Sequence, residues 1–497
     1  MLFRQLAPGA ALAAALTLGP VSGAAAQDAA PAPAYRLLSS AEHILALVKA
    51  ADDKLPYVPG EVLVKFRDGL TPIDQQRALS ALRSRPGVGS LEWTGDVAIL
   101  RDSSEPDAAL LAERLSQQPE VEYAEPNALY RHTTTPNDPS FTSRQWNFTA
   151  IGVDRAWDIN PGASKNVIVA VVDYGITTVT NNYTFATWDG RAITGTSVAY
   201  RVNPDLSASR LLDGRDFAFW GGPVLDMDGH GTHVSSTIGE DTNNGVAEAG
   251  IAYNATILPL KACLGYWDVQ FTLSALGIRG YAPADAGGCT ASAIASAIRY
   301  AADNGAAVIN LSLGGPGTST TIRDAMTYAV QHGSLVAVAM GNEYEEGNPT
   351  DYPAGYAGQI DGVIAVGAVG RSLKRAYYSN TGPHNELAAP GGDVRDGGVA
   401  GTIWQAGLNP SDYDPHSVIF PRFDRYVELP EQGTSMATPH VAGVAALVYS
   451  QGVKDPAAIE KLLEATAQDL GATGRDNEFG YGLIQPRAAL RGFGIAR

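Results

Sequence analysis

The sequence predicts an α/β domain with a mostly parallel sheet covered by helices, preceded by a small α+β domain. Beyond residue 133, continuous apolar runs alternate with helix patterns, as in parallel sheets that are buried on both faces. Residues 57–132 instead follow the order strand, helix, strand, strand, helix, strand, which is the split ferredoxin-like arrangement. The turn-rich segment "TTTPNDPSF" separates the two patterns and predicts an exposed linker.

Residues 1–26 are typical of a secretory signal peptide. Arg4 precedes an apolar stretch, and small residues end it at Ala26. A membrane anchor is the alternative, but Pro and Gly residues interrupt the apolar run, and no later segment has the unbroken apolar length that spans a bilayer. We therefore expect a secreted protein, extracellular or periplasmic, with an Ala/Pro-rich linker over 27–56.

The small domain over 57–132 is predicted from short runs of alternating or helical apolar periodicity. The predicted strands are "GEVLVKF", "GSLEWTG", "DVAILR" and "VEYAEPNALYR". The predicted helices are "IDQQRALSALRS" and "DAALLAERLSQQPE".

In the large domain, the apolar runs predict buried strands at 167–173, 306–315, 335–342 and 362–370. Helices are predicted at 291–303, 319–332, 435–450 and 456–468. In such a sheet, reactive groups gather at the carboxyl ends of the strands. Two long insertions, 176–226 and 264–288, interrupt this pattern, and we expect the aromatic residues of the second to pack in a core: Tyr266, Trp267 and Phe271.

The composition excludes several classes of partner. Of 497 residues, 45% are hydrophobic and 18% are charged, which favours a large folded core over disorder. Asp and Glu number 52 against 35 Lys and Arg, and the net charge of -17 opposes binding to nucleic acid or to an anionic membrane.

The chain has two cysteines, Cys263 and Cys289. In an exported protein they mature in an oxidising compartment, which favours a disulfide. On the chain-entropy model, closing the loop between them stabilises the fold by roughly 3.5 kcal/mol. Two free, buried thiols remain the alternative.

Three polar residues stand at the ends of predicted elements. Asp173 ends the strand "VIVAVVD", where an Asp is often only a turn former. His230 precedes a helix of small residues, and the neighbouring His233 suggests a metal pair, but the H-E-x-x-H arrangement is absent. Ser435 begins a helix whose free N–H groups and dipole favour developing negative charge, although an ordinary N-cap serine has the same position.

Together, these segments resemble the subtilisin-like serine proteases, the subtilases, in which the same three residue types occur in the order Asp, His, Ser. The matching segments are "VAVVDYGI", "DGHGTHVSSTIG", "VINLSLGGPG", "VAVAMGNE", "GVIAVGAV", "GTSMATPHVAGVAALV" and "FGYGLIQPRAAL". The resemblance covers nearly all of residues 137–490 and implies a three-layer peptidase domain over 133–497. The 57–132 domain resembles the inhibitory propeptide of the family.

The resemblance implies a role for each residue of the constellation. Ser435 would attack the peptide carbonyl, His230 would carry the proton to the leaving amine, and Asp173 would orient the imidazole. Asn342 would donate its side-chain amide to the oxyanion beside the backbone N–H of Ser435. His233 would then be structural.

The resemblance also implies a substrate cleft. An extended peptide would bind beside the "SLGG" segment, formed by Ser312, Leu313, Gly314 and Gly315. The pocket for the residue before the scissile bond would have Met340 in its wall and Asp351 near its base. Asp351 would then favour a basic side chain, and a solvent-facing Asp351 without such a role is the alternative.

One residue departs from the family pattern: Tyr174 follows Asp173 where most subtilases have Thr or Ser. A phenol does not fit the same space, and this leaves a catalytically weak or inactive binding protein as the alternative function. An α/β-hydrolase is disfavoured because Ala437 breaks the G-x-S-x-G pattern and the Ser comes last.

The remaining expectations follow from the family. The chain would be a zymogen whose propeptide acts as chaperone and inhibitor and is cut between about Arg131 and Thr135. Its chemistry would need no cofactor, whereas structural calcium is common in the family, with no ligand set evident here. We expect a monomer that acts on polypeptides.

Overall fold

The structure is a computed structural model. It describes residues 45–50, 53, 55–80, 88–102, 106–129, 135–218, 222–416 and 420–492. The predicted signal peptide over 1–26 lies outside the described residues. By their internal contacts, residues 1–132 and 133–497 form two compact units.

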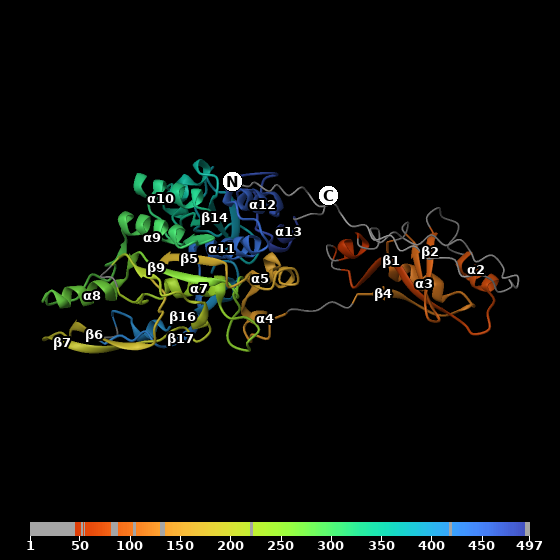
Figure 1. Ribbon diagram of the computed structural model, residues 1–497, viewed down its shortest axis with the longest axis horizontal. Coiled ribbons are helices and arrows are strands. Elements are labelled where there is room, and N and C mark those ends of the chain that lie inside the picture. The colour runs from red at the N-terminus through yellow and green to blue at the C-terminus, as the bar shows by residue number, and fades with distance from the viewer. Residues whose placement is uncertain are drawn as a thin grey trace, which may run out of the picture. The chain divides into compact units, whose positions relative to one another are not determined.

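The first unit contains a four-stranded antiparallel sheet with the strand order β2-β3-β1-β4 (Figure 1). Its elements are β1 (Tyr57–Phe66), α2 (Pro72–Ser80), β2 (Val88–Thr94), β3 (Val97–Asp102), α3 (Ala108–Ser116) and β4 (Val121–Ala128). Alternate residues of β1, including Val62 and Val64, pack against Leu111 and Leu115 of α3 in one core. Asp107 begins α3 by accepting hydrogen bonds from two of its first N–H groups. This is the ferredoxin-like order that the sequence predicts.

The second unit is built on a seven-stranded sheet with the order β15-β14-β13-β12-β5-β9-β8, in which every pair of neighbours is parallel. The strands are β5 (Ile168–Asp173), β8 (Arg215–Asp216), β9 (Thr256–Lys261), β12 (Val308–Leu311), β13 (Leu335–Ala339), β14 (Val363–Val369) and β15 (Leu387–Pro390). All the residues of β12, β13 and β14 are buried, as are all those of β5 except Ile168, which explains the continuous apolar sequences of these strands.

Helices cover both faces of this sheet and make three layers (Figure 1). They are α7 (His230–Gly239), α9 (Ala291–Asp303), α10 (Thr320–Gln331), α11 (Thr434–Ser450) and α12 (Pro456–Thr466). Because side chains alternate along a strand, Val169 and Val171 face the core under α7 and α11, whereas Ala170 and Val172 face the core under α9 and α10. The predicted three-layer α/β fold is confirmed.

Parts of the two insertions, together with residues 403–431, form an accessory layer with a separate core. It contains the hairpin of β6 (Asn181–Trp188) and β7 (Ile193–Tyr200), the helix α8 (Tyr266–Ala275) and the pair β16 (Ile403–Leu408) and β17 (Tyr426–Glu431). Trp267 and Phe271 are buried there with Tyr200, as expected, whereas Tyr266 packs against the same core and is only partly buried. No described helix has the length and apolarity that a membrane crossing requires.

Candidate active site

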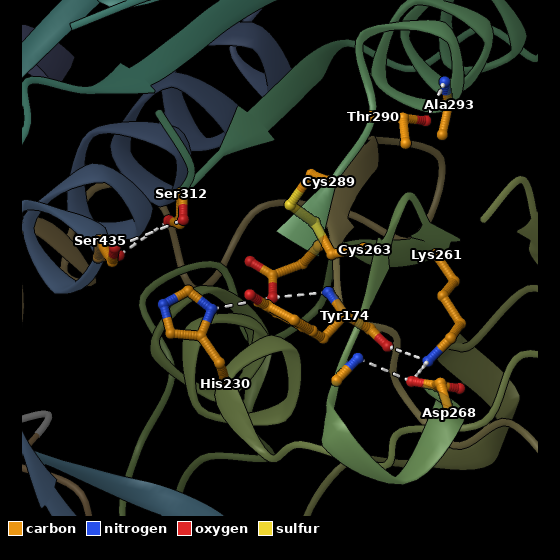
Figure 2. Close-up of a disulfide and its surroundings, with 12 residues drawn as sticks. Tyr174, His230, Lys261, Cys263, Asp268, Cys289, Thr290, Ala293, Ser312 and Ser435 are labelled. Atoms are coloured by element: carbon orange, nitrogen blue, oxygen red, sulfur yellow. Dashed lines mark hydrogen bonds and ion pairs between the residues drawn. A yellow bond between two sulfur atoms is a disulfide. The ribbon is translucent and has the colours of Figure 1, made fainter. Parts of the chain in front are cut away.

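Asp173 and His230 meet where β5 ends and α7 begins (Figure 2). The Oδ1 atom of Asp173 lies 2.8 Å from Nδ1 of His230. The aspartate side chain is 2% exposed and the histidine side chain 23% exposed. The backbone N–H of Tyr174 also donates to Asp173 Oδ1, at 2.8 Å. The carboxylate is therefore held by two donors, one of which is the backbone of the unusual Tyr174.

The start of α7 is fixed by a buried carboxylate that the sequence analysis did not single out. Asp226, which is fully buried, accepts hydrogen bonds from the N–H groups of Asp228 and Gly229 at 2.9 and 2.8 Å, and from the hydroxyl of Thr232 at 2.5 Å. Gly231 allows the helix to approach the loop after β5, because a Cβ atom there would lie 2.2 Å from the carbonyl oxygen of Gly175. These contacts fix the position of His230 relative to Asp173.

Ser435 is the second residue of α11, at the opposite side of the imidazole. Figure 2 shows the His230 ring between Tyr174 and Ser435, with the ring nitrogen not bonded to Asp173 on the side of Ser435. The Ser435 hydroxyl donates to the carbonyl of Ser312 at 3.3 Å rather than to His230. The Ser312 hydroxyl in turn donates to the Ser435 carbonyl at 2.8 Å. Catalytic hydrogen bonds are often long or misaligned without substrate, so this arrangement is compatible with a proton transfer to His230.

Asn342 lies beside the amino end of α11. Its Oδ1 atom accepts hydrogen bonds from the N–H of Thr434 at 2.8 Å and from the Thr434 hydroxyl at 3.0 Å. This orientation leaves the amide nitrogen free to donate. A Cβ atom on Gly433 would lie 3.6 Å from the Ser435 nitrogen and 3.8 Å from Asn342 Nδ2, so the missing side chain keeps the space between these two donors open. The first N–H groups of a helix have no acceptor within it.

The charges around His230 favour its protonated form. Burial by itself would lower the pKa of the imidazole, but the neighbouring Asp173, then Glu431 and Asp228, together raise the pKa to about 10. The neutral ring, which can accept a proton, therefore becomes abundant only at alkaline pH. The sequence does not indicate that Glu431, at the end of β17, lies near His230, because the two residues are 201 positions apart in the chain.

His230, Asn342 and Ser435 line one cavity of about 600 Å³. Its wall includes the whole predicted segment Ser312, Leu313, Gly314 and Gly315. Tyr174, Gly288 and Cys289 line the same cavity.

The two residues expected around the specificity pocket do not line this cavity. Met340 is fully buried in the core under α9 and α10. Asp351 is 3% exposed, which excludes the solvent-facing alternative. Its carboxylate lies beneath the wall, since Cβ atoms on Gly314 and Gly341 would lie 3.4 and 2.6 Å from Asp351 Oδ2. Burial, and then the negative charge of Glu343, raise the pKa of Asp351 to about 7.

The predicted disulfide joins Cys263 to Cys289, and the free-thiol alternative is wrong. The bond links β10 (Cys263–Leu264) to β11 (Gly288–Cys289), which pair antiparallel. Because Cys289 lines the cavity, the disulfide fixes one wall of the cleft.

A buried ion pair, also missed by the sequence analysis, supports the loop after Asp173 (Figure 2). The Lys261 ammonium is 3.0 Å from Asp268 Oδ2 and also donates to the carbonyl oxygens of Tyr174 and Leu225 at 2.7 and 3.1 Å. Both side chains are 1% exposed or less. The available signal was a lysine in the otherwise apolar strand "TILPLK".

The metal reading of His230 and His233 has no support in the geometry. His233 is fully buried, and its Nε2 atom lies 3.2 Å from the carbonyl oxygen of Leu429. Within the described part of the chain, the group of acidic residues or histidines close enough to share a metal ion is Glu386, Glu460 and Glu464, which contains neither histidine.

A second set of buried carboxylates, of Asp138, Asp205, Glu240 and Glu248, lies close enough for mutual repulsion but is not among the groups of described residues that could share one metal ion. Glu240 and Glu248 are fully buried, and neither oxygen of Glu248 has a hydrogen-bond partner, whereas the backbone N–H of Ala406 lies close enough to Glu240 to favour its ionised form. Asp205 Oδ2 is also unpartnered, and Asp138 lies close enough to repel the same charges. Burial raises the pKa of Asp205 and of Glu248 to about 7. Burial and mutual repulsion favour the protonated, neutral form of such carboxyl groups.

Comparison with known proteins identifies both units. Residues 164–482 match the model of the subtilase family, and residues 46–127 match that of the fervidolysin N-terminal prodomain. The thermophilic serine proteinase of Bacillus sp. (strain AK1) is 32% identical over 445 residues, which cover 89% of this chain and 90% of that protein. The extracellular protease of Xanthomonas campestris pv. campestris is 32% identical over 405 residues, 77% of this chain and 61% of that protein. The crystal structure of fervidolysin from Fervidobacterium pennivorans aligns with a TM-score of 0.51 and 26% identity, and covers 88% of this chain and 61% of that chain.

Proposed function

The chain belongs to the subtilase family of serine proteases, and from this premise we propose that it is a secreted endopeptidase whose reaction uses Asp173, His230 and Ser435. The observation that carries the proposal is the hydrogen bond between Asp173 and His230, with the other ring nitrogen on the side of Ser435.

The reaction follows from the chemistry of these groups. The neutral His230 imidazole accepts the proton of the Ser435 hydroxyl as the oxygen attacks the peptide carbonyl. Asp173 stabilises the resulting imidazolium, which then gives its proton to the leaving amine. Water then attacks the acyl carbon while His230 accepts a proton from it. His230 returns that proton to the Ser435 oxygen as the bond to the acyl group breaks.

The negative charge of the tetrahedral intermediate needs donors at a fixed position. The amide nitrogen of Asn342 and the backbone nitrogen of Ser435 both lie within 4 Å of the position that a Cβ atom on Gly433 would occupy. The positive end of the α11 dipole adds to their effect. These donors are oriented before the reaction begins, which is what makes such groups effective.

Substrate specificity has a general and a particular part. The backbone of Ser312 to Gly315 would pair with an extended substrate and is indifferent to its side chains. Asp351, beneath Gly314 and Gly341, would add a preference for Lys or Arg before the scissile bond when its carboxyl is ionised.

The ferredoxin-like unit over 57–132 matches a prodomain family, which supports synthesis as a zymogen. In this proposal the unit assists folding, inhibits the enzyme and is removed by cleavage between about Arg131 and Thr135. Amino-terminal sequencing of active, secreted material tests this, and an active chain that still begins at Gln27 would contradict it.

Export and calcium complete the proposal. Secretion is supported by the disulfide and by relatives that are named extracellular proteases. A structural calcium ion, which is common in the family, would supply positive charge to oxygen ligands and would take no part in the proton transfers.

The alternative function, an inactive binding protein, rested on Tyr174. The backbone N–H of that residue donates to Asp173 Oδ1, so this oxygen, which also contacts His230, is held without a Thr or Ser hydroxyl, although the buried Oδ2 atom has no hydrogen-bond partner. This contact favours the enzyme.

The decisive experiment compares the mature wild-type protein with Ser435→Ala. We expect a fluorophosphonate probe to label only the wild type, and a peptide substrate to be cleaved only by the wild type. Thermal unfolding of both proteins serves as the control for folding. Absence of labelling and cleavage in correctly folded, propeptide-free wild type would refute the proposal.

A further inference from the structure

Lys261 is the direct neighbour of Asp173 in the central sheet, where β9 and β5 end side by side. The parallel register pairs these two residues, and the N–H of Ala262 donates to the carbonyl of Asp173 at 2.8 Å. The lysine side chain is 1% exposed, and it is not among the residues that line the cavity with Ser435. Any influence of Lys261 on the reaction must therefore pass through its neighbours in the protein.

The Lys261 ammonium makes three hydrogen bonds, which is as many as it has hydrogens (Figure 2). It donates to the carbonyl oxygens of Tyr174 and Leu225 at 2.7 and 3.1 Å, and to Asp268 Oδ2 at 3.0 Å. A buried ammonium without these acceptors would be costly. The ammonium and its three acceptors are therefore held in one arrangement.

The two carbonyl oxygens belong to the two segments that carry Asp173 and His230. Tyr174 directly follows Asp173, and its N–H donates to Asp173 Oδ1 at 2.8 Å. Leu225 directly precedes Asp226, whose carboxylate accepts from the N–H groups just before α7, the helix that begins with His230. One buried charge thus joins the segment after β5 to the segment before α7.

Asp268 holds the ammonium from the side of the accessory layer. It is the third residue of α8, and its side chain is 0% exposed. The Oδ2 atom accepts from the N–H of Gly265 at 2.9 Å as well as from Lys261. Because an uncompensated charge is strongly unfavourable in this interior, the carboxylate determines where the ammonium lies.

We propose that Lys261, held by Asp268, is a positioning residue that sets the contact between Asp173 and His230. The inference rests on the proposed peptidase function and adds to it a residue that acts through the backbone and does not touch the substrate. Without the ammonium, the two segments lose their shared donor, and the bond of 2.8 Å between Asp173 and His230 weakens.

The pH dependence of the reaction reports on that bond. Burial lowers the pKa of His230, and the charge and hydrogen bond of Asp173 contribute most to offsetting this and raising it. A weaker contact with Asp173 therefore lowers the pKa of the imidazole. Loss of the positive charge of Lys261 by itself does the opposite, because it stabilises the imidazolium. The direction of the shift distinguishes positioning from a direct electrostatic effect.

The test begins with Lys261→Met, which replaces the ammonium by an apolar side chain of similar length. We expect kcat to fall by about tenfold to a hundredfold, the effect of a misplaced catalytic group, with KM within about twofold of the wild type. The rise of kcat/KM with pH should move to lower pH by about one unit. Lys461→Met removes an exposed lysine that lies 4.0 Å from Asp361, and this matched control should leave kcat, KM and the profile unchanged.

The double variant Lys261→Met with Asp268→Leu separates positioning from stability. Apolar side chains in place of both charges leave no unpaired charge, so the free energy of unfolding should return towards that of the wild type. The carbonyl oxygens of Tyr174 and Leu225 still lack their donor, so the low kcat and the shifted profile should remain. Where Lys261→Met alone does not fold, the double variant is measured in its place.

Three results would overturn the inference. They are wild-type kcat and pH profile in Lys261→Met, a shift of its profile to higher pH, and recovery of the wild-type kcat and profile in the double variant. Each of them leaves the peptidase function intact. Failure of the peptidase function itself has a different signature, namely no fluorophosphonate labelling of the folded wild type.

Discussion

The ammonium group of Lys261 lies 3.0 Å from the carboxylate of Asp268, and both side chains are buried. The same ammonium donates to the carbonyl of Tyr174, the residue directly after Asp173. The pair therefore connects the accessory helix α8 to the loop that orients the histidine.

Removing one member of this pair should destabilise the protein strongly. In Asp268→Ala the buried ammonium loses its counter-charge, and we expect the free energy of unfolding in urea to fall by about 3–5 kcal/mol. Arg395→Ala breaks the exposed pair with Glu345 and is the matched control, for which little change is expected. If Asp268→Ala unfolded at the same urea concentration as the wild type, the pair would not stabilise the fold.

The activity should rise with pH into the alkaline range. Ser435 needs the neutral form of His230, and the pKa of that imidazole is raised to about 10, so kcat/KM should increase with pH up to about that value. Glu431→Gln removes a negative charge that stabilises the imidazolium. The pKa must then fall, and the profile should move to lower pH. Asp361→Asn removes an exposed carboxylate on another surface and should leave the profile unchanged, whereas a shift to higher pH in Glu431→Gln would contradict the electrostatic account.

Loss of the Asn342 amide should affect the transition state rather than binding. We expect Asn342→Ala to lower kcat by about 10²–10³-fold with KM nearly unchanged, a magnitude known from removal of the equivalent donor in a member of this family. Asn342→Asp is a useful companion because it keeps the acceptor for Thr434 and loses the donor. If either variant retained wild-type kcat, the amide would not contact the developing oxyanion.

The preference before the scissile bond should depend on pH through Asp351. The pKa of its carboxyl is raised to about 7, so the group gains its negative charge as the pH rises through that value. The ratio of kcat/KM for Lys to that for Leu substrates should therefore increase from pH 6 to pH 8 in the wild type. Asp351→Asn should abolish the increase, and Asp324→Asn on the surface of α10 should preserve it. A pH-independent ratio in the wild type would show that Asp351 does not determine the preference for Lys over Leu.

Calcium should stabilise the mature protein. At free calcium about a hundredfold above Kd, a single site adds about 2.7 kcal/mol, so a chelator should lower Tm and calcium, but not magnesium, should restore it. An identical Tm with and without chelator would exclude a structural calcium ion.

Local periodicity was sufficient for most of the fold. Strands such as "VIVAVVD" are apolar throughout because both faces of the sheet are covered, and α9 was predicted with the boundaries that the structure has. The order of elements also predicted the four-stranded sheet of the first unit. The accessory layer could not be predicted in the same way, because β6, β7 and α8 pack on each other through contacts between distant insertions.

The sequence by itself determined the family, the three-layer architecture and the residue types available for the chemistry, because motifs and periodicity are properties of short segments. The tertiary structure decided how those residues are supported. It placed the charge of Glu431 near His230, the carboxylate of Asp351 beneath the cleft wall, and Lys261 under the loop after Asp173. Such relationships depend on side-chain distances and burial between segments that are far apart in the chain, and these are set only when the whole domain packs.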